Sequence, residues 1–222
     1  MISIAIDGPA GAGKSTLSRT MAKKLGFMYV DTGALYRTIG LKFSRLGFDT
    51  ELNCDVAEVL KDTVADIRFI ENEQRVFLDG EDVSEKIRTA EASMMASAVS
   101  ARPEVRAYLL DKQRELAKNN NVVMDGRDIG TVVLPDATLK IYLTASAEDR
   151  AMRRYKEMLE KGMTAQYDDV LADIIKRDYN DMHRDIAPLK QAQDAVLADT
   201  TGYEFEQSLE LLLKIVKEGI KF

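Results

Sequence analysis

The chain has very little cysteine and histidine, and it has no long apolar run. Among 222 residues the only cysteine is Cys54 and the only histidine is His183. A single thiol forms no internal disulfide, so we expect a reducing, cytoplasmic environment. No stretch approaches the roughly 18 apolar residues of a membrane-spanning helix. The opening run MISIAI lacks a basic segment and a cleavage site, so we expect no signal peptide.

Positive charge is not in excess either. The chain has 31 Lys and Arg against 37 Asp and Glu, a formal net charge of −6. A dedicated nucleic-acid binder needs a basic face that neutralises phosphates, so we expect no nucleic-acid partner, and also no membrane partner. No repeats or Pro/Ser-rich linkers divide the chain. We therefore expect one large domain with appendages, present as a monomer.

Short apolar runs alternate with amphipathic helical patterns. We expect strands over residues 2–6, 27–30, 121–126, 138–143 and 195–199. We expect helices over 14–25, 34–47, 89–101, 103–119, 147–162 and 168–183, and a last helix capped by Thr201 and Glu204. This alternation predicts an α/β domain with a mainly parallel sheet. Two further short strands within 65–82 flank the polar turn ENEQ and predict an inserted hairpin.

The most specific local motif is the glycine-rich segment GPAGAGKS at residues 8–15. It matches the pattern G-x-x-x-x-G-K-[S/T] in full, between an expected strand and an expected helix. Glycines let successive backbone N–H groups turn toward an anion, and the helix N-terminus adds the positive end of its dipole. Lys14 has the reach for the β- and γ-phosphates of a nucleotide, and the Ser15 hydroxyl suits Mg²⁺. The segment therefore predicts a nucleotide-binding loop.

Such loops occur in kinases, GTPases, motors and translocases. The chain is short for a motor, and it has no N-K-x-D segment to read guanine. Tyr36 and Arg37 follow the second expected strand, whereas Asp125, Arg127 and Asp128 follow or end the third. Ligands bind at the carboxyl ends of strands in open α/β sheets, so we expect these groups near the loop. Asp125 is placed as an acid that orients Mg²⁺.

Charged side chains also cluster on two predicted helices. Each of two groups shares one helix face: Arg150, Arg153 and Arg154 in the first, and Arg177, Asp181 and Arg184 in the second. The simpler interpretation is a solvated surface with intrahelical ion pairs. The polar segment GMTAQYDD between the two groups instead suits a mobile lid that closes arginines over transferring phosphates.

Segments along most of the chain resemble the bacterial cytidylate kinases, a branch of the nucleoside monophosphate (NMP) kinases. The matching segments are IDGPAGAGKST, DTGALYR, EDVSEKIRT, DGRDIGTVVLPDA, RDYNDMHRDIAPL and VLADTT. The resemblance implies a three-layer P-loop kinase with a five-stranded parallel sheet, an NMP-binding insertion with a small β-hairpin, and a helical lid. It implies a single kinase domain over 1–222. The expected core covers about 1–35, 85–150 and 185–222, the NMP-binding region about 36–100 with its insertion at 60–90, and the lid about 150–185.

The resemblance also implies transfer of the ATP γ-phosphoryl group to CMP or dCMP, with Mg²⁺ as cofactor. It assigns the ATP phosphates to Gly8, Pro9, Ala10, Gly11, Ala12, Gly13, Lys14, Ser15 and Thr16. It assigns CMP to Thr32, Tyr36, Arg37, Ser97, Arg106, Arg127, Asp128, Arg177 and Asp181. The expected catalytic residues are Lys14, Arg127, Arg150, Arg153, Arg154 and Arg184. The expected Mg²⁺ ligand is Ser15, with Asp125 behind it.

Two alternatives remain open at this point. One is a nucleotide sensor that does not turn over, and the other is a kinase for another acceptor, such as UMP, AMP or shikimate. An ADP-release assay with a panel of acceptors separates them.

His183 is expected at the surface or in helix packing, because the acceptor phosphate is already an anionic nucleophile and needs no strong base.

Overall fold

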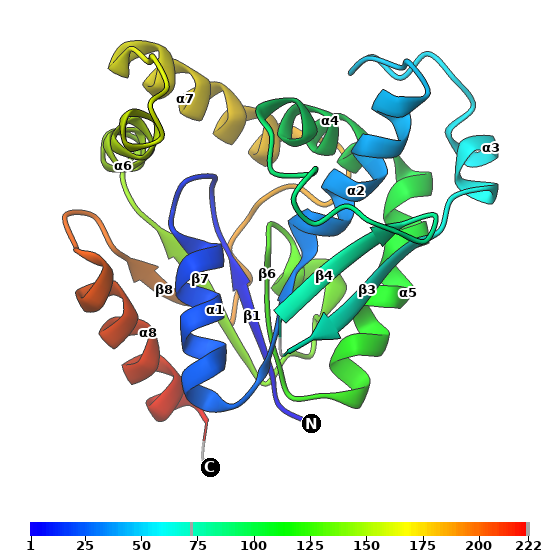
Figure 1. The fold of residues 1–222 in the computed structure, drawn as a ribbon. Coiled ribbons are helices and arrows are strands. Elements are labelled where there is room, and N and C mark those ends of the chain that lie inside the picture. The colour runs from blue at the N-terminus through cyan, green and yellow to red at the C-terminus, as the bar shows by residue number, and fades with distance from the viewer. Residues whose placement is uncertain (72, 221–222) are drawn as a thin grey trace. The chain divides into compact units, whose positions relative to one another are not determined.

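The computed structural model describes residues 1–71 and 73–220, which form two compact units (Figure 1). The central unit comprises Met1 and Met28–Asn120. The split unit comprises Ile2–Phe27 and Asn121–Phe222. Within the described residues, no helix is both long and apolar enough to cross a lipid bilayer.

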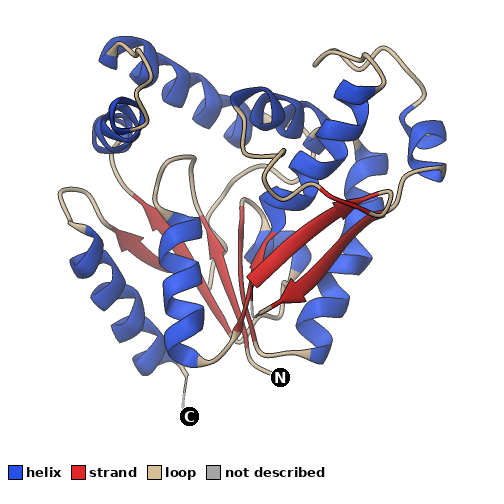
Figure 2. Cartoon of the chain, in the orientation of Figure 1, coloured by secondary structure: helices blue, strands red, loops and turns tan. Residues whose placement is uncertain are grey.

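The large sheet has five strands in the order β2–β6–β1–β7–β8. Their bounds are β1 Ser3–Asp7, β2 Met28–Asp31, β6 Val122–Gly126, β7 Leu139–Thr144 and β8 Val196–Asp199. Figure 2 draws the strands in red and the helices in blue. Within the split unit all pairs are parallel, and Ile4 of β1 stands in register with Val123 and Leu139. Ile4, Ala5 and Ile6 are completely buried, as expected for the central strand of a covered parallel sheet. The predicted five-stranded parallel sheet is confirmed.

Four helices belong to the split unit: α1 Lys14–Leu25, α6 Ala147–Glu160, α7 Tyr167–His183 and α8 Phe205–Gly219. Helices α1 and α8 lie side by side against the strands (Figure 1). Helices α6 and α7 pack on each other through Ala151, Val170 and Ile174. The cap of α8 is Glu204, whose side chain forms a capping box with Gln207, and Thr201 does not cap this helix. The Thr201 hydroxyl instead accepts a hydrogen bond from the Ser146 N–H, so that prediction was wrong.

The central unit is built on four helices: α2 Thr32–Arg45, α3 Val56–Lys61, α4 Ala90–Ser100 and α5 Pro103–Asn119. Its core joins Leu35, Ile39 and Phe43 of α2 to apolar residues of α3, α4 and α5. Helices α2 and α4 approach closely, since a Cβ on Gly40 would lie 2.9 Å from the Cβ of Met95. Helix α2 begins at Thr32, two residues before the predicted start, because the Asp31 carboxylate caps it by accepting from the Ala34 N–H.

A small antiparallel sheet lies in the central unit. Its strands are β3 Ala65–Ile70, β4 Glu73–Leu78 and β5 Glu81–Asp82, in that order. The predicted hairpin is therefore present and carries a short third strand. Val76, Leu78 and Val83 bury an apolar face against Ala34 and Leu41 of α2. The insertion consequently packs along α2.

A single π-helical turn, η1, covers Ile129–Val133, directly after β6 and the sequence Arg127-Asp128. Its wide spacing is seen in the bonds from the Val133 N–H to the Asp128 carbonyl and from the Leu134 N–H to the Ile129 carbonyl. Turns of this kind are frequent at functional sites. The sequence patterns gave no indication of it.

Candidate functional site

The glycine-rich loop follows β1 and ends in α1, in the split unit. Gly8 has no room for a side chain, since a Cβ there would lie 1.9 Å from the Leu143 carbonyl oxygen. Gly13 caps α1 with a φ of 80°, a left-handed conformation that favours glycine. The first turn of α1 contains no acidic residue. The positive end of this helix therefore faces the loop without a competing carboxylate from its own first turn, which suits a phosphate.

Lys14 folds back over the loop. Its Nζ donates to the Pro9 carbonyl at 2.7 Å, and the side chain is buried. Burial and the nearby Arg127 guanidinium together lower the pKa of Lys14 to about 7, although Asp125, Asp181 and Asp7 act in the opposite direction. An anion placed in the loop would favour the charged form. The lysine is thus positioned to neutralise a bound phosphate.

Ser15 and Asp125 bring two hard oxygen donors together next to the glycine-rich loop. The Ser15 hydroxyl donates to Oδ2 of Asp125 at 3.1 Å, which joins the start of α1 to the end of β6. Among residues 1–71 and 73–220, no group of three or more His, Cys, Asp or Glu side chains is arranged to hold a metal. A hydroxyl and a carboxylate are hard oxygen donors of the kind Mg²⁺ prefers, and Mg²⁺ usually takes its remaining ligands from water and substrate phosphates. The two residues fit such an ion.

Asp7 at the end of β1 holds the π-helical turn. Its two carboxylate oxygens each accept one backbone N–H, from Ile129 and Gly130, both at 2.7 Å. Burial, with a smaller contribution from the Asp128 charge, raises the pKa of Asp7 to about 6. The two backbone hydrogen bonds act in the opposite direction. The carboxylate therefore fixes the segment that follows Arg127 and Asp128. The sequence analysis did not identify Asp7, because a lone acid before a glycine carries no motif.

The end of α7 lies beside the segment after β6. Arg127 Nε donates to Oδ2 of Asp181 at 2.7 Å, and both side chains are largely buried. Arg184 forms a longer bond of 3.4 Å with Asp128 and donates from Nε to the Ala187 carbonyl at 2.7 Å. Arg177 lies one turn before Asp181 on α7 and is half-buried. Four residues predicted from strand ends and helix faces, Arg127, Asp128, Asp181 and Arg184, are thus brought together.

Arg150 connects three segments of the split unit. Its guanidinium donates to the Ala10 carbonyl in the glycine-rich loop at 2.9 Å, to the Ala145 carbonyl at 2.9 Å and to Asp178 of α7 at 2.7 Å. Only 5% of its side chain is exposed. Arg150 therefore ties the loop to both helices of the predicted lid. Asp178 was not identified from the sequence, although it lies three residues before Asp181.

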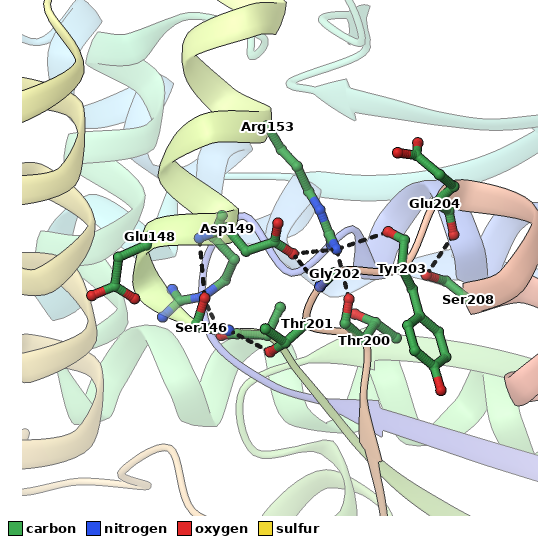
Figure 3. A network of polar contacts seen from close by, with 12 residues as sticks. Ser146, Glu148, Asp149, Arg153, Thr200, Thr201, Gly202, Tyr203, Glu204 and Ser208 are labelled. Atoms are coloured by element: carbon green, nitrogen blue, oxygen red, sulfur yellow. Dashed lines mark hydrogen bonds and ion pairs between the residues drawn. The ribbon is translucent and has the colours of Figure 1, made fainter.

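Arg153 links α6 to the segment between β8 and α8 (Figure 3). Its Nη2 donates to the carboxylate of Asp149 at 2.6 Å and to the carbonyls of Thr200 and Tyr203 at 2.8 and 3.2 Å. Asp149 also accepts from the Gly202 N–H at 3.3 Å. Arg154, the third arginine of the group, is more exposed and pairs with Glu157 at 3.1 Å. The three arginines therefore have different partners despite their shared helix.

The central unit contains the other predicted substrate residues. Thr32, Tyr36 and Arg37 lie in the first turns of α2, and Arg37 Nη2 donates to Asp31 at 2.8 Å. Ser97 lies on α4, which packs on α2. Arg106 of α5 is buried, and its guanidinium carbon lies 5.7 Å from the centre of the Tyr36 ring. Arg106 also donates to the Ser100 carbonyl at 3.3 Å.

Comparisons with known proteins identify the family to which the chain belongs. The model of the cytidylate kinase family matches residues 4–218. The chain is 50% identical to a cytidylate kinase of Caldicellulosiruptor bescii, over 99% of this chain and 97% of that one. It is 52% identical to a cytidylate kinase of Caldicellulosiruptor saccharolyticus, over 96% and 95%. A gluconokinase structure from Sinorhizobium meliloti shares the fold, with a TM-score of 0.52 at 12% identity over 98% of this chain and 92% of that one. The chain belongs to the cytidylate kinase family.

Proposed function

We propose that this kinase transfers the γ-phosphoryl group of ATP to CMP or dCMP, giving ADP and CDP or dCDP. An oxygen of the acceptor phosphate attacks the γ-phosphorus, and the bond from that phosphorus to the oxygen shared with the β-phosphate breaks. The observation that carries the proposal is the glycine-rich loop, with Lys14 over it and Ser15 bonded to Asp125, in a member of this family. The reaction needs no general base from the protein, because the acceptor oxygen is already charged.

The loop and Lys14 bind the triphosphate. The start of α1 and the backbone N–H groups of Gly8 and of Ala10 to Thr16 face the phosphates, and Lys14 moves from the Pro9 carbonyl to the transferring group. Arg150 keeps the Ala10 carbonyl in place, so the loop keeps its shape when the nucleotide leaves. Preorganised charge of this kind lowers the barrier because no reorganisation is needed during transfer.

The family uses ATP with a divalent metal ion, and we propose Mg²⁺. The Ser15 hydroxyl would ligate it directly, and Asp125 would orient the ion and its water ligands. When bound, Mg²⁺ neutralises charge on the β- and γ-phosphates and keeps them aligned for transfer.

The residues proposed for the acceptor are assigned from the family resemblance. We assign the CMP phosphate to Thr32, Tyr36, Arg37 and Arg127, and the cytosine to Ser97, Arg106 and Asp128. We assign the ribose and the phosphates to Arg177, Asp181 and Arg184. A carboxylate accepts from the cytosine N4 amino group, whereas a guanidinium donates to N3, and uracil reverses both positions. This pairing favours cytosine.

In this proposal residues 150–185 act as a lid, and residues from about 36 to 100, which include the insertion, form the NMP-binding region. Lid closure excludes water, which would otherwise accept the phosphoryl group. Arg150, Arg153 and Arg154 are the arginines that the lid carries. We further propose that the protein works as a monomer in the cytoplasm.

An assay of ADP release with Mg-ATP tests the proposal. CMP, dCMP, UMP, AMP and shikimate are compared as acceptors, and a sample without acceptor gives the ATP hydrolysis rate. The highest kcat/KM for CMP or dCMP, with CDP or dCDP as product, is the expected result. ADP release that no acceptor changes would identify a sensor or hydrolase, and a higher value for another acceptor would reassign the substrate.

A further inference from the structure

Gln74 of β4 connects the insertion to the residue that precedes α2 by hydrogen bonds. Its Oε1 accepts from the Asp31 N–H at 2.8 Å, and its Nε2 donates to the Asp31 carbonyl at 3.2 Å. The primary amide thus forms with one residue of β2 the donor and acceptor pair that a neighbouring strand would form. Both residues are half-buried. A backbone group in such a place needs a partner, and the insertion supplies it.

Asp31 is in turn the residue that organises the first turns of α2. Its Oδ1 accepts from the Ala34 N–H at 3.0 Å and caps the helix. Its Oδ2 accepts from Arg37 Nη2 at 2.8 Å. Both the backbone and the side chain of Asp31 therefore have hydrogen-bond partners. Gln74 holds its backbone, and its carboxylate holds Arg37 and the turn that contains Thr32.

The apolar face of the insertion packs along α2 from Ala34 to Leu41, whereas its ion pairs with α2 lie far from this end. Lys42 pairs with Asp79 at 2.7 Å, and Arg45 pairs with Glu81 through two bonds of 2.8 and 3.2 Å. These pairs are exposed or partly exposed and lie near the C-terminus of α2. They attach the insertion without touching the residues assigned to the acceptor phosphate.

We propose that Gln74 is a positioning residue for the acceptor phosphate, acting through Asp31 on Arg37. The inference rests on the proposed function, in which Arg37 binds the phosphate of CMP. Without Gln74, the backbone N–H and carbonyl of Asp31 bond to water instead. The ion pair between Asp31 and Arg37 is then no longer held in one position. In this proposal the insertion supports acceptor binding indirectly, because Gln74 acts through Asp31 and Arg37 and does not contact the substrate itself.

Gln74→Ala tests this by steady-state kinetics. We expect the KM for CMP to rise about tenfold, as two hydrogen bonds are lost, while the KM for ATP changes less than twofold. Gln74→Glu keeps the side-chain size and the acceptor for the Asp31 N–H, but its carboxylate repels the Asp31 carbonyl, so it should raise the same KM at least threefold. Glu81→Gln is the matched control, since it loosens the insertion at the far end of α2, and it should leave both KM values unchanged.

A double-mutant cycle with Arg37→Ala shows whether the effect passes through Arg37. In the Arg37→Ala background, Gln74→Ala should add less than a twofold further rise in the KM for CMP. If both Gln74 variants fold and keep the wild-type KM for CMP while Arg37→Ala raises it, the positioning role is wrong and the proposed function stands. Equal rises in the KM for CMP and for ATP would reduce Gln74 to a structural residue. If Arg37→Ala leaves the KM for CMP unchanged, the assignment of Arg37 fails and the inference fails with it.

Discussion

Arg150 and Asp178 form an ion pair of 2.7 Å, with 5% and 13% of their side chains exposed. Breaking this pair leaves the buried Arg150 guanidinium without its carboxylate partner. We expect Asp178→Asn to lower the free energy of unfolding by about 2 kcal/mol, because the amide keeps a weaker hydrogen bond. Urea denaturation measures this. Asp173→Asn, an exposed acid on the same helix, should change stability by less than about 0.5 kcal/mol. Equal effects of the two substitutions would contradict the structural role of the pair.

Lys14→Met removes the cation over the phosphate loop and keeps an unbranched apolar stem. Groups that stabilise transition-state charge contribute roughly 3 kcal/mol, so we expect kcat to fall about a hundredfold or more. The fold should remain intact, since Lys14 is already buried. Lys24→Met, at the exposed end of α1, should retain wild-type turnover. A wild-type kcat in Lys14→Met would contradict the assignment of the glycine-rich loop to the nucleotide phosphates.

Asp7 makes stability depend on pH in the opposite sense to most carboxylates. Its pKa in the folded protein is raised from 3.8 to about 6, so the folded state binds more protons than the unfolded state between these values. The stability that this group contributes therefore falls as pH rises from about 4 to 6, by up to about 3 kcal/mol, and is constant above. Asp7→Asn cannot titrate.

Urea denaturation of the wild type and Asp7→Asn between pH 4.5 and pH 8 tests this sign. The difference in unfolding free energy, wild type minus variant, should fall between pH 4.5 and pH 7 and then level off. A difference that stays constant or increases over that range would show that Asp7 has an ordinary pKa in the folded protein.

Asp128→Asn tests the reading of cytosine. The amide keeps the shape, and its N–H₂ group can donate to the O4 of uracil. We expect kcat/KM for CMP to fall and the ratio of the CMP to the UMP value to decrease by at least about tenfold, the equivalent of 1.4 kcal/mol. Asp136→Asn, exposed on the segment after η1, is the control and should leave the ratio unchanged. Equal losses of kcat/KM for CMP and UMP would show that Asp128 does not contact the base.

The strands and the loop could be predicted because local pattern determines them. Completely apolar runs such as Ile4 to Ile6 form buried parallel strands, and the glycine spacing of residues 8–13 has a direct backbone reason. The third strand of the small sheet could not be predicted, since Glu81–Asp82 is short and polar and pairs only because β4 lies beside it. The π-helical turn was missed for a similar reason, because Asp7, far away in sequence, holds it.

Side chains that converge in the structure could be predicted where they belong to sequence motifs, and they were missed where one residue holds another in place. Arg127 and Asp181 came from a strand end and a helix face, and the structure joins them at 2.7 Å. Asp178 and Gln74 hold other residues in place, and such roles leave no fixed spacing in the sequence. Arg150 was assigned from its helix face and from the family resemblance, whereas its bond to the Ala10 carbonyl depends on the tertiary fold.

The π-helical turn makes the protein more sensitive to the length of this segment than to its side chains. An i→i+5 turn contains one residue more than an α-helical turn of the same path. Removing any one residue from Ile129–Val133 would tighten the turn and displace the N–H groups that Asp7 holds, together with Asp128 before them. Apolar exchanges at Val132 or Val133 would leave that backbone path unchanged. Deletions and substitutions in the same five residues should therefore have very different consequences.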